Sequence, residues 1–296
     1  MSQRIPDRGP FSLDDEPAYR RWRAEKLDAQ PADVGDLLVP IADPLHLSPA
    51  ERSALLARVA QANLALFAWD PGTTATATLR AFLGQLGLHR LDRNLEAGED
   101  GVTEIAVRAG GERTYVPYTN RPLSWHTDGY YNPPYRRIRA WALYCVRDAA
   151  EGGANELLDH EIAYIRLRDR NPAWIAALMA PDAMAIPANA GEDGTLREAQ
   201  SGPVFSVDSQ DGRLQMRYSG RQRNIAWRDD PATREAEEAL RALFSAGDDR
   251  MLRVRLAPGQ GLVSNNVLHR REAFSDVPDR PRLILRARYY DRVDAA

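Results

Sequence analysis

The sequence predicts a mainly β domain with flanking helices, built as a barrel or jelly roll. Helical patterns dominate the first hundred of the 296 residues, and short runs typical of antiparallel strands follow from residue 101. No linker, internal repeat or low-complexity tract divides the chain. We therefore expect one domain over residues 1–296, in which a helical elaboration over 1–100 packs on a strand-rich core over 101–296.

The first hundred residues contain one well-marked helix start. Ser48 is suited to cap a helix, Pro49 fits the first helical position, and Glu51 completes a capping box. Residues 1–30 are expected to form an N-terminal arm with one short helix. The other elements expected here are a strand over 37–41, a strand over 64–69 and a helix over 74–86.

The remainder of the chain alternates strand and turn signals. Residues 204–218 predict a β-hairpin with Asp211-Gly212 as its turn. Asp159 is suited to cap a helix, and residues 233–244 form an amphipathic helix with acidic residues early. Strands are expected over 102–107, 139–146, 252–256 and 282–290, with a further strand beginning at Leu262 and leading toward His269.

Composition excludes several classes of protein. Hydrophobic residues at 44% and charged residues at 27% are typical of a globular domain. A net charge of −3 gives no excess of basic residues that would bind nucleic acid or an anionic membrane. No apolar run is long enough to span a bilayer. Residues 1–6 lack the apolar core of a secretory signal, so a cytoplasmic location is expected. The single cysteine, Cys145, lies in an apolar run and is expected to pack in the core.

The most informative residues are His126 and Asp128, together with the distant His269. On an extended strand, residues two apart point to the same face, so an imidazole and a carboxylate are able to grip one ion. By itself His-x-Asp is a weak signal, since Asp128 also suits a turn before Gly129. Two histidines and one carboxylate on one face of a metal form the triad of non-haem Fe(II) oxygenases, which leaves positions open for cosubstrate and oxygen.

A second signal is the strand near the C-terminus, in which arginines recur with period two. Arg282, Ile284, Arg286 and Arg288 share one face of this strand. One interpretation is the solvated face of an edge strand, which applies most to Arg288. The other is a barrel interior, where a guanidinium holds a carboxylate through paired hydrogen bonds. An iron oxygenase needs a two-electron reductant, and 2-oxoglutarate would chelate iron while Arg282 holds its distal carboxylate.

These residues resemble the taurine and chlorophenoxyacetate dioxygenase (TauD/TfdA-like) family, which includes γ-butyrobetaine hydroxylase and clavaminate synthase relatives. The resemblance runs from about residue 100 to the C-terminus. Four segments carry it, namely residues 125–128, 152–159, 266–270 and 282–286. It implies a double-stranded β-helix that uses Fe(II), 2-oxoglutarate and O2, and that yields succinate and CO2.

The resemblance also assigns roles. It implies that His126, Asp128 and His269 bind iron and are the catalytic centre, and that Arg282 binds the distal carboxylate of 2-oxoglutarate. It places Arg286 near the cosubstrate or an anionic substrate. Asn155 stands where relatives often contact 2-oxoglutarate through a hydroxyl, and its amide is still able to donate a hydrogen bond. Asp128 is retained, whereas halogenating relatives replace it by a small residue, so hydroxylation is favoured.

Substrate identity is only weakly indicated. Tyr130 follows the metal motif and is suited to line the pocket, although a loop with packed aromatics explains it equally well. Arg221, Arg223 and Asn224 follow the predicted hairpin and would suit an anionic group, or are simply solvated. Together with Arg286 they favour a small anionic metabolite. Hydroxylation and, where it occurs beside a heteroatom, subsequent bond cleavage both stay open as outcomes.

Two other functions remain open from the residues. A zinc or manganese hydrolase or isomerase on a cupin-like barrel would use the same triad without needing O2. A non-catalytic binding protein would be expected to lack a ligand, whereas all three are present. The expected partners are a small-molecule substrate and, as in many relatives, further copies of the chain, with neither nucleic acid nor membrane.

Overall fold

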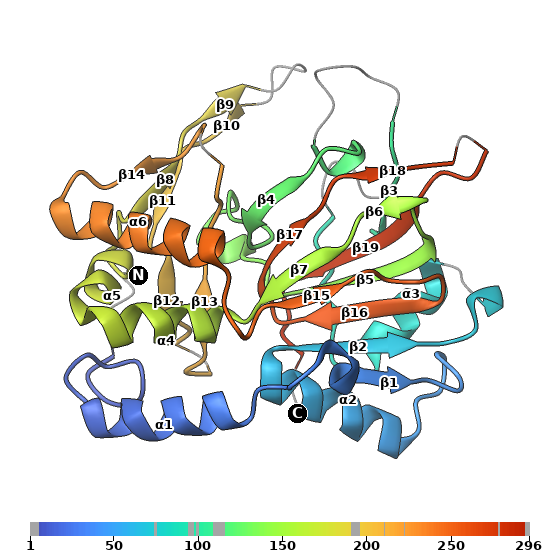
Figure 1. Ribbon diagram of the computed structural model, residues 1–296, viewed down its shortest axis with the longest axis horizontal. Helices are drawn as coiled ribbons and strands as arrows, with labels where there is room; N and C mark the ends of the chain where they lie inside the picture. Colours follow the sequence, from blue (N-terminus) through green and yellow to red (C-terminus); the bar gives the residue numbers. More distant parts are fainter. Residues whose placement is uncertain are drawn as a thin grey trace. The chain divides into compact units, whose positions relative to one another are not determined.

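The computed structural model describes residues 6–73, 76–93, 98, 101–108, 116–190, 196–209, 211–221, 223–277 and 279–293. The chain folds into two compact units, each assembled from segments that are distant in sequence (Figure 1). The first unit comprises Met1–Gln30, Trp125–Tyr135 and Leu158–Met251, and the second comprises Pro31–Ser124, Arg136–Leu157 and Leu252–Ala296. The expected division at residue 100 stays a prediction.

A six-stranded sheet forms the centre of the second unit. Its strands lie in the order β1 (Leu38–Pro40), β2 (Leu64–Ala68), β16 (Gln260–Ser264), β5 (Ala140–Arg147), β19 (Leu283–Tyr289) and β3 (Thr103–Ile105). The β1–β2 pair is parallel, and the other pairs in this sheet are antiparallel. The strands expected over 37–41, 64–69, 102–107, 139–146 and 282–290 are each matched by a strand of this sheet.

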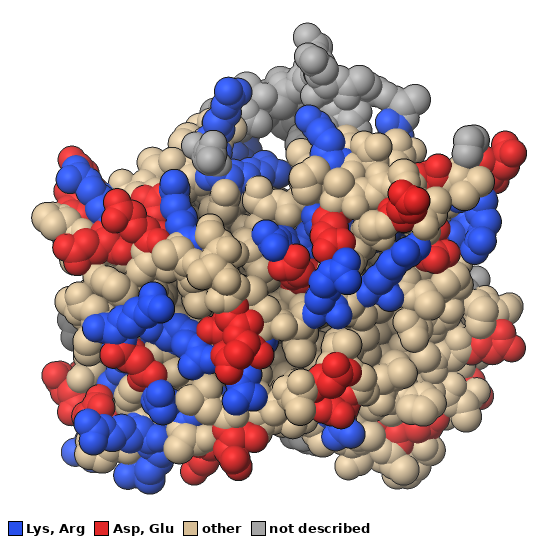
Figure 2. All heavy atoms as spheres, viewed as in Figure 1, with Lys and Arg blue, Asp and Glu red and all other residues tan. Residues whose placement is uncertain are grey.

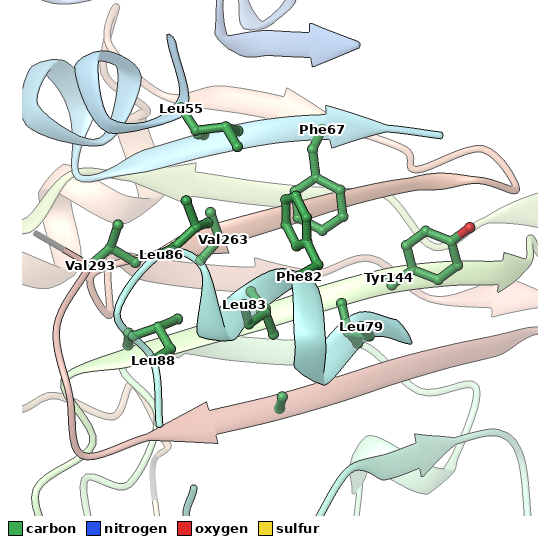
Figure 3. Packing of buried hydrophobic residues seen from close by; sticks show 14 of the residues in the cluster. Leu55, Phe67, Leu79, Phe82, Leu83, Leu86, Leu88, Tyr144, Val263 and Val293 are labelled. Atoms are coloured by element: carbon green, nitrogen blue, oxygen red, sulfur yellow. The ribbon is translucent and has the colours of Figure 1, made fainter. Parts of the chain in front are cut away.

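Two helices of the second unit cover this sheet with apolar side chains. They are α2 (Pro49–Ala62) and α3 (Thr76–Gly84). Figure 3 shows Phe82 of α3 packed toward Phe67 of β2, with Tyr144 of β5 nearby. The rings of Phe67 and Phe82 lie 4.6 Å apart between centroids, and all three side chains are almost fully buried. This cluster is the main hydrophobic core of the unit, and its burial is the principal stabilising contribution there.

The start of α2 is the one predicted from its sequence. The Ser48 side chain accepts a hydrogen bond from the Glu51 amide, and the Glu51 carboxylate accepts one from the Ser48 amide. Pro49 occupies the first turn, where its missing N–H costs nothing. Asn63 ends the helix in a left-handed conformation with φ of 56°. The expected start of α3 at Thr74 lies outside the described residues.

A second sheet carries the strand of the distal histidine. Its order is β15 (Leu252–Val254), β7 (Asn155–Leu158), β17 (Leu268–Arg271) and β4 (Leu123–His126). A short pair, β18 (Phe274–Ser275) with β6 (Glu151–Gly152), also lies in the second unit.

The expected single strand from Leu262 toward His269 is wrong. It is divided into β16 and β17, which belong to different sheets. Asn266 lies between them with a left-handed φ of 56°, and its side-chain amide donates to the carbonyl of Ile138 at 2.8 Å. Ser264 accepts a hydrogen bond from the Val267 amide at 3.0 Å. Asn is one of the few residues that tolerate this conformation, so it redirects the chain from one sheet to the other.

The first unit is richer in helix. Its helices are α1 (Glu16–Asp28), α4 (His160–Arg170), α5 (Pro172–Leu178) and α6 (Pro231–Ala246). Its strands form three small sheets: β11 (Gln200–Gly202), β8 (Met184–Ile186) and β14 (Ala226–Trp227); the pair β9 (Asn189–Ala190) and β10 (Leu196–Arg197); and the hairpin β12 (Phe205–Val207) and β13 (Leu214–Met216). The hairpin was predicted, and Gly212 in its turn has the positive φ of 68° that favours glycine.

The only lysine of the sequence, Lys26, joins α1 to the start of α4. Its ammonium group lies 2.6 Å from a carboxylate oxygen of Asp159 and 2.6 Å from one of Glu161, and all three side chains are buried. Burial alone would lower the pKa of Lys26, but the two carboxylates outweigh it and hold this pKa above its ordinary value. The expected cap at Asp159 is confirmed, since Asp159 also accepts from the Glu161 amide.

Replacing this lysine tests how much the buried cluster contributes to stability. Lys26→Met is expected to lower the free energy of unfolding by about 3–5 kcal/mol, because it leaves two buried carboxylates without their cation. Urea denaturation provides the measurement. Arg20→Met is the matched control on the same helix, because it breaks an exposed pair with Glu16 and should cost about 0.5 kcal/mol or less. Equal losses in the two variants would contradict the assigned role of Lys26.

Charged side chains on the face shown in Figure 2 are interspersed, with basic and acidic groups side by side. Exposed ion pairs also occur among the described residues, such as Arg253 with Glu272 at 2.8 Å. No helix among the described residues is long and apolar enough to cross a membrane.

Candidate metal centre

The first two predicted ligands stand at the end of β4, in the first unit. His126 is the last residue of the strand, and Asp128 comes from the turn that follows it. The His126 Nε2 and an Asp128 carboxylate oxygen are 3.7 Å apart. Both groups therefore point to one place, although Asp128 lies beyond the strand rather than on it. Gly129, with φ of 67°, allows the chain to turn away directly afterwards.

A neighbouring segment, residues 218–220, fixes the backbone of these ligands. The Thr127 amide donates to the Tyr218 carbonyl at 3.0 Å, and the Tyr218 amide donates to the Thr127 hydroxyl at 3.0 Å. The Gly220 amide donates to the Trp125 carbonyl at 2.7 Å. A Cβ on residue 220 would lie 3.2 Å from that carbonyl oxygen, so glycine permits the close approach. On the other side, Trp125 stacks on Phe244 of α6 with centroids 5.2 Å apart.

The third predicted ligand, His269, lies on β17 in the second unit and is buried. Its Nδ1 is 3.1 Å from the carbonyl oxygen of Val267. Because a carbonyl only accepts, Nδ1 carries the proton, and Nε2 is the nitrogen whose lone pair suits a cation. The Trp141 ring packs against the imidazole, with centroids 4.3 Å apart and planes tilted by 41°. The ring is thus held in one orientation from two sides.

The structure brings these three side chains together. One donor atom each from His126, Asp128 and His269 lies within 4.8 Å of the others. Two imidazoles and one carboxylate form a donor set suited to Fe(II) with open positions. No other group of three such side chains with this spacing occurs in the described part of the chain.

Arg282, immediately before β19, is buried in the second unit. Its guanidinium lies 5.0 Å from the centroid of the Phe274 ring, and its backbone amide donates to Asp276 at 3.0 Å. No carboxylate of the described residues forms an ion pair with the guanidinium, and burial lowers the pKa of Arg282. Gly153, with φ of 74°, packs beside it, and a Cβ there would lie 3.5 Å from the Arg282 Nε. A buried charge without a partner is costly, so this site is suited to receive an anion.

Arg271, on β17, is a second buried arginine nearby. Burial, and then the charge of Arg282, lower the pKa of Arg271 to about 9. Sequence reasoning did not single out this residue, because its environment is set by contacts that are distant in sequence.

The remaining arginines of the last strand differ from one another. The pairing of β19 with β5 shifts register between Leu283 and Ile284, so Arg282 does not continue the alternation of Arg286 and Arg288. Arg286 is half-buried, and its Nε has no hydrogen-bond partner in the described structure. The interpretation of Arg288 as a solvated residue of an edge strand is wrong. β19 lies between β5 and β3, and the buried Arg288 pairs with the buried Asp92.

Asn155 and the glycines before it form a tight corner. Gly152 and Gly153 both have positive φ, and Asn155 begins β7, paired in register with Val254. A Cβ on residue 152 would lie only 2.2 Å from the Ala273 carbonyl oxygen. These glycines are therefore required for the close packing of this corner, and Asn155 is buried next to it.

The residues predicted to bind substrate are only partly brought together. Tyr130 is buried, and the Arg221 guanidinium lies 5.9 Å from the centroid of its ring. Burial raises the pKa of Tyr130. Arg223 and Asn224 are exposed, and Asn224 has a left-handed φ of 62°, as expected for a turn residue. Tyr130 and Arg221 thus remain candidates supported by a contact, whereas Arg223 and Asn224 make none with this group.

Comparison with known sequences assigns the family. Residues 25–288 match the taurine catabolism dioxygenase TauD, TfdA family. The chain belongs to this family. The expectation of an oxidoreductase that depends on Fe(II) and 2-oxoglutarate, with O2 as oxidant, is thereby confirmed at the level of the TauD, TfdA family.

Two curated relatives of this family member share a name. The chain is 36% identical over 174 residues to a uridine-5'-phosphate dioxygenase of Amycolatopsis sp, covering 56% of the chain and 60% of the relative. It is 35% identical over 199 residues to a uridine-5'-phosphate dioxygenase of Streptomyces sp, covering 64% of the chain and 69% of that relative. The matched region thus spans about three fifths of the first relative.

Solved structures of iron oxygenases share the fold of this TauD, TfdA family chain. A non-heme iron oxygenase, OrfP, in complex with Fe and alpha-ketoglutaric acid superposes with a TM-score of 0.61 at 18% identity, covering 84% of this chain and 81% of OrfP. A taurine dioxygenase from Burkholderia xenovorans superposes with a TM-score of 0.57 at 18% identity, covering 84% of each chain. These likenesses confirm a mainly β fold with helices.

Two further arginines near the tyrosines were not predicted. The Arg197 guanidinium lies 5.6 Å from the centroid of the Tyr131 ring. Arg217 donates to the carbonyls of Tyr130 at 3.2 Å and Gly202 at 3.0 Å. Neither residue stands in a motif, and only the folding of distant loops onto residues 130–131 reveals them.

Proposed function

We propose that this protein is an Fe(II)- and 2-oxoglutarate-dependent dioxygenase with a double-stranded β-helix core. The observation that carries this proposal is the convergence of His126, Asp128 and His269 on one place. The buried Arg282, which lacks a carboxylate partner, supports it independently. The six-stranded and four-stranded sheets support the double-stranded β-helix.

Each proposed site residue has a distinct task. His126, Asp128 and His269 would hold Fe(II), which supplies the activation of O2 when bound. Arg282 would hold the distal carboxylate of 2-oxoglutarate by paired hydrogen bonds. The Asn155 amide would donate to the cosubstrate, and Arg286 would offer a further cation to the cosubstrate or an anionic substrate. The contact of His269 with Val267 fixes which nitrogen faces the metal.

We propose a nucleoside 5'-phosphate as the substrate class. Both curated relatives are named uridine-5'-phosphate dioxygenases. In the first unit, Arg197 and Arg221 lie against the Tyr131 and Tyr130 rings. Neither guanidinium forms an ion pair with a carboxylate of the described residues. Guanidinium groups that do not pair with a carboxylate suit a phosphate, and aromatic rings suit a base.

The proposed reaction predicts a definite set of products. Replacing a hydrogen by hydroxyl on the carbon that bears the phosphate ester gives a carbon with two oxygen substituents. This carbon expels inorganic phosphate and becomes an aldehyde, while 2-oxoglutarate loses CO2 to give succinate. Uridine 5'-phosphate should therefore yield succinate and inorganic phosphate in equal amounts, and uridine, which lacks the phosphate ester, should leave succinate at the level measured without substrate. Quantifying both products in the presence of Fe(II) and O2 tests the reaction.

Replacement of Arg221 tests the substrate side of the site. Arg221→Ala is expected to raise the KM for uridine 5'-phosphate about 10- to 100-fold, because one charge-assisted hydrogen bond to the phosphate is lost. Arg223→Ala is the matched control, since Arg223 is an exposed arginine without a contact to this group. An equal effect in both variants would overturn the assignment of Arg221.

The outcomes separate the class of enzyme from its substrate. If Fe(II) and 2-oxoglutarate bind but no nucleotide is turned over, the substrate class is wrong. If turnover needs no O2, the alternative of a metal-dependent hydrolase or isomerase takes its place. A cytoplasmic location, self-association and the exclusion of nucleic acid stay predictions.

A further inference from the structure

Arg271 connects the strand of the distal histidine to the chain that leads into β4. It lies two residues after His269 on β17 and is buried. Its Nη2 donates to the carbonyls of Thr119 at 2.8 Å and Arg121 at 2.6 Å, and its Nη1 donates to the carbonyl of Pro117 at 3.2 Å. The Arg271 side chain thus donates hydrogen bonds to three carbonyls of residues 117–121. This segment ends two positions before β4 begins.

The residues after β17 reinforce this connection. The Phe274 amide donates to the carbonyl of Asn120 at 3.1 Å, so four carbonyls of residues 117–121 are held by residues 271–274. The Phe274 ring lies 4.8 Å from the guanidinium of Arg271 and 5.0 Å from that of Arg282. Phe274 therefore contacts the segment before β4 through its backbone amide, and its ring contacts the guanidinium groups of both Arg271 and Arg282.

Regular secondary structure does not supply hydrogen-bond donors for all of these carbonyls. Residues 117–121 include the end of a 3-10 turn and an irregular stretch, so no ladder pairs all of their backbone groups. A guanidinium is planar and carries five donors, and this geometry allows it to hold several carbonyls at once. A lysine would preserve the charge at this position, but a single ammonium group does not reproduce the fork.

We propose that Arg271 is a positioning residue of the metal centre. It sets residues 117–121, and through them the course of β4, at whose end His126 and Asp128 stand. This inference rests on the proposed iron site. Its function is distinct from that of Arg282, because the Arg271 donors are directed to backbone carbonyls rather than to a cosubstrate.

Iron affinity and local backbone protection together test this role. Arg271→Lys and Arg271→Met are both expected to bind Fe(II) about 10- to 100-fold more weakly than the wild type in anaerobic titration, the range usual for residues that orient metal ligands. Hydrogen exchange of the amides in residues 116–126 should become faster in both variants, with or without iron. Arg253→Met is the control, because it breaks only the exposed pair with Glu272 near the same strand.

The results distinguish the two proposals. If the wild type binds no Fe(II), the iron site itself is refuted. If the wild type binds Fe(II) and Arg271→Lys binds it equally well, the positioning role is refuted, even if the variant melts at a lower temperature. Unchanged exchange of residues 116–126 in both variants would refute it as well.

Discussion

His269→Ala is expected to abolish the binding of Fe(II) and all oxygen-dependent turnover. Changes in residues that merely orient metal ligands cost about 10- to 100-fold in metal affinity, so the loss of one of three ligands should exceed about 100-fold. The imidazole is held in place by the Val267 carbonyl and the Trp141 ring. Anaerobic titration with Fe(II), followed by 2-oxoglutarate, gives the measurement through the visible charge-transfer band of the chelate.

The same titration compares variants of the proposed metal ligands with a variant of a histidine that lies outside the site. Asp128→Ala should match His269→Ala, because it removes the only carboxylate of the triad. His46→Ala should behave as the wild type, since His46 is exposed and its Nδ1 contacts Asp43 at 2.8 Å. A charge-transfer band that persists at full strength in His269→Ala would remove His269 from the metal centre.

Local signals predicted many of the elements. The capping box of Ser48 and Glu51 marks the start of α2, and the Asp-Gly turn marks the hairpin of β12 and β13. Both signals depend on residues within a few positions of one another, so their physical cause is already present in the sequence. The buried Cys145 was expected from its apolar run in the same way, and burial raises the pKa of its thiol to about 12.

The wrong predictions concern residues whose partners are distant in sequence. Arg288 has the same spacing whether its partner is water or the buried Asp92, which is 196 residues away. Asn266 turns the chain between two sheets because its backbone is left-handed, a choice that period-two alternation does not reveal. The cluster at Lys26 likewise depends on the docking of α1 against the start of α4.

The candidate site was predicted where chemistry restricts the residue types. Two histidines and one carboxylate are donors that suit a metal, and together with the arginine strand that follows they indicated one, although their convergence required the fold. Arginine is a common surface residue, and spacing alone did not separate the buried Arg271 and Arg282 from exposed ones. Burial without a carboxylate partner among the described residues is the physical feature that makes Arg282 a candidate binding residue.

Arg282→Met is expected to weaken the binding of 2-oxoglutarate about 30-fold to several thousand-fold. Truncating one partner of a buried charge pair costs about 2–5 kcal/mol, and each 1.4 kcal/mol is a factor of ten. Methionine keeps much of the apolar stem against Phe274, so the packing there is largely retained. The dissociation constant is measured anaerobically with Fe(II) bound. Arg280→Met is the control, since Arg280 is exposed and contacts Asp148 at 3.6 Å.

Unfolding experiments on the same variant separate a binding role from a structural one. Because no carboxylate of the described residues pairs with the buried guanidinium, its removal should leave the ligand-free protein at least as stable as the wild type in urea. Adding 2-oxoglutarate at 100 times its dissociation constant should stabilise the wild type by about 2.7 kcal/mol. The same concentration should stabilise Arg282→Met far less. A variant that is unstable without ligand, yet is stabilised as strongly as the wild type, would show that Arg282 supports the fold and that another cation holds the cosubstrate.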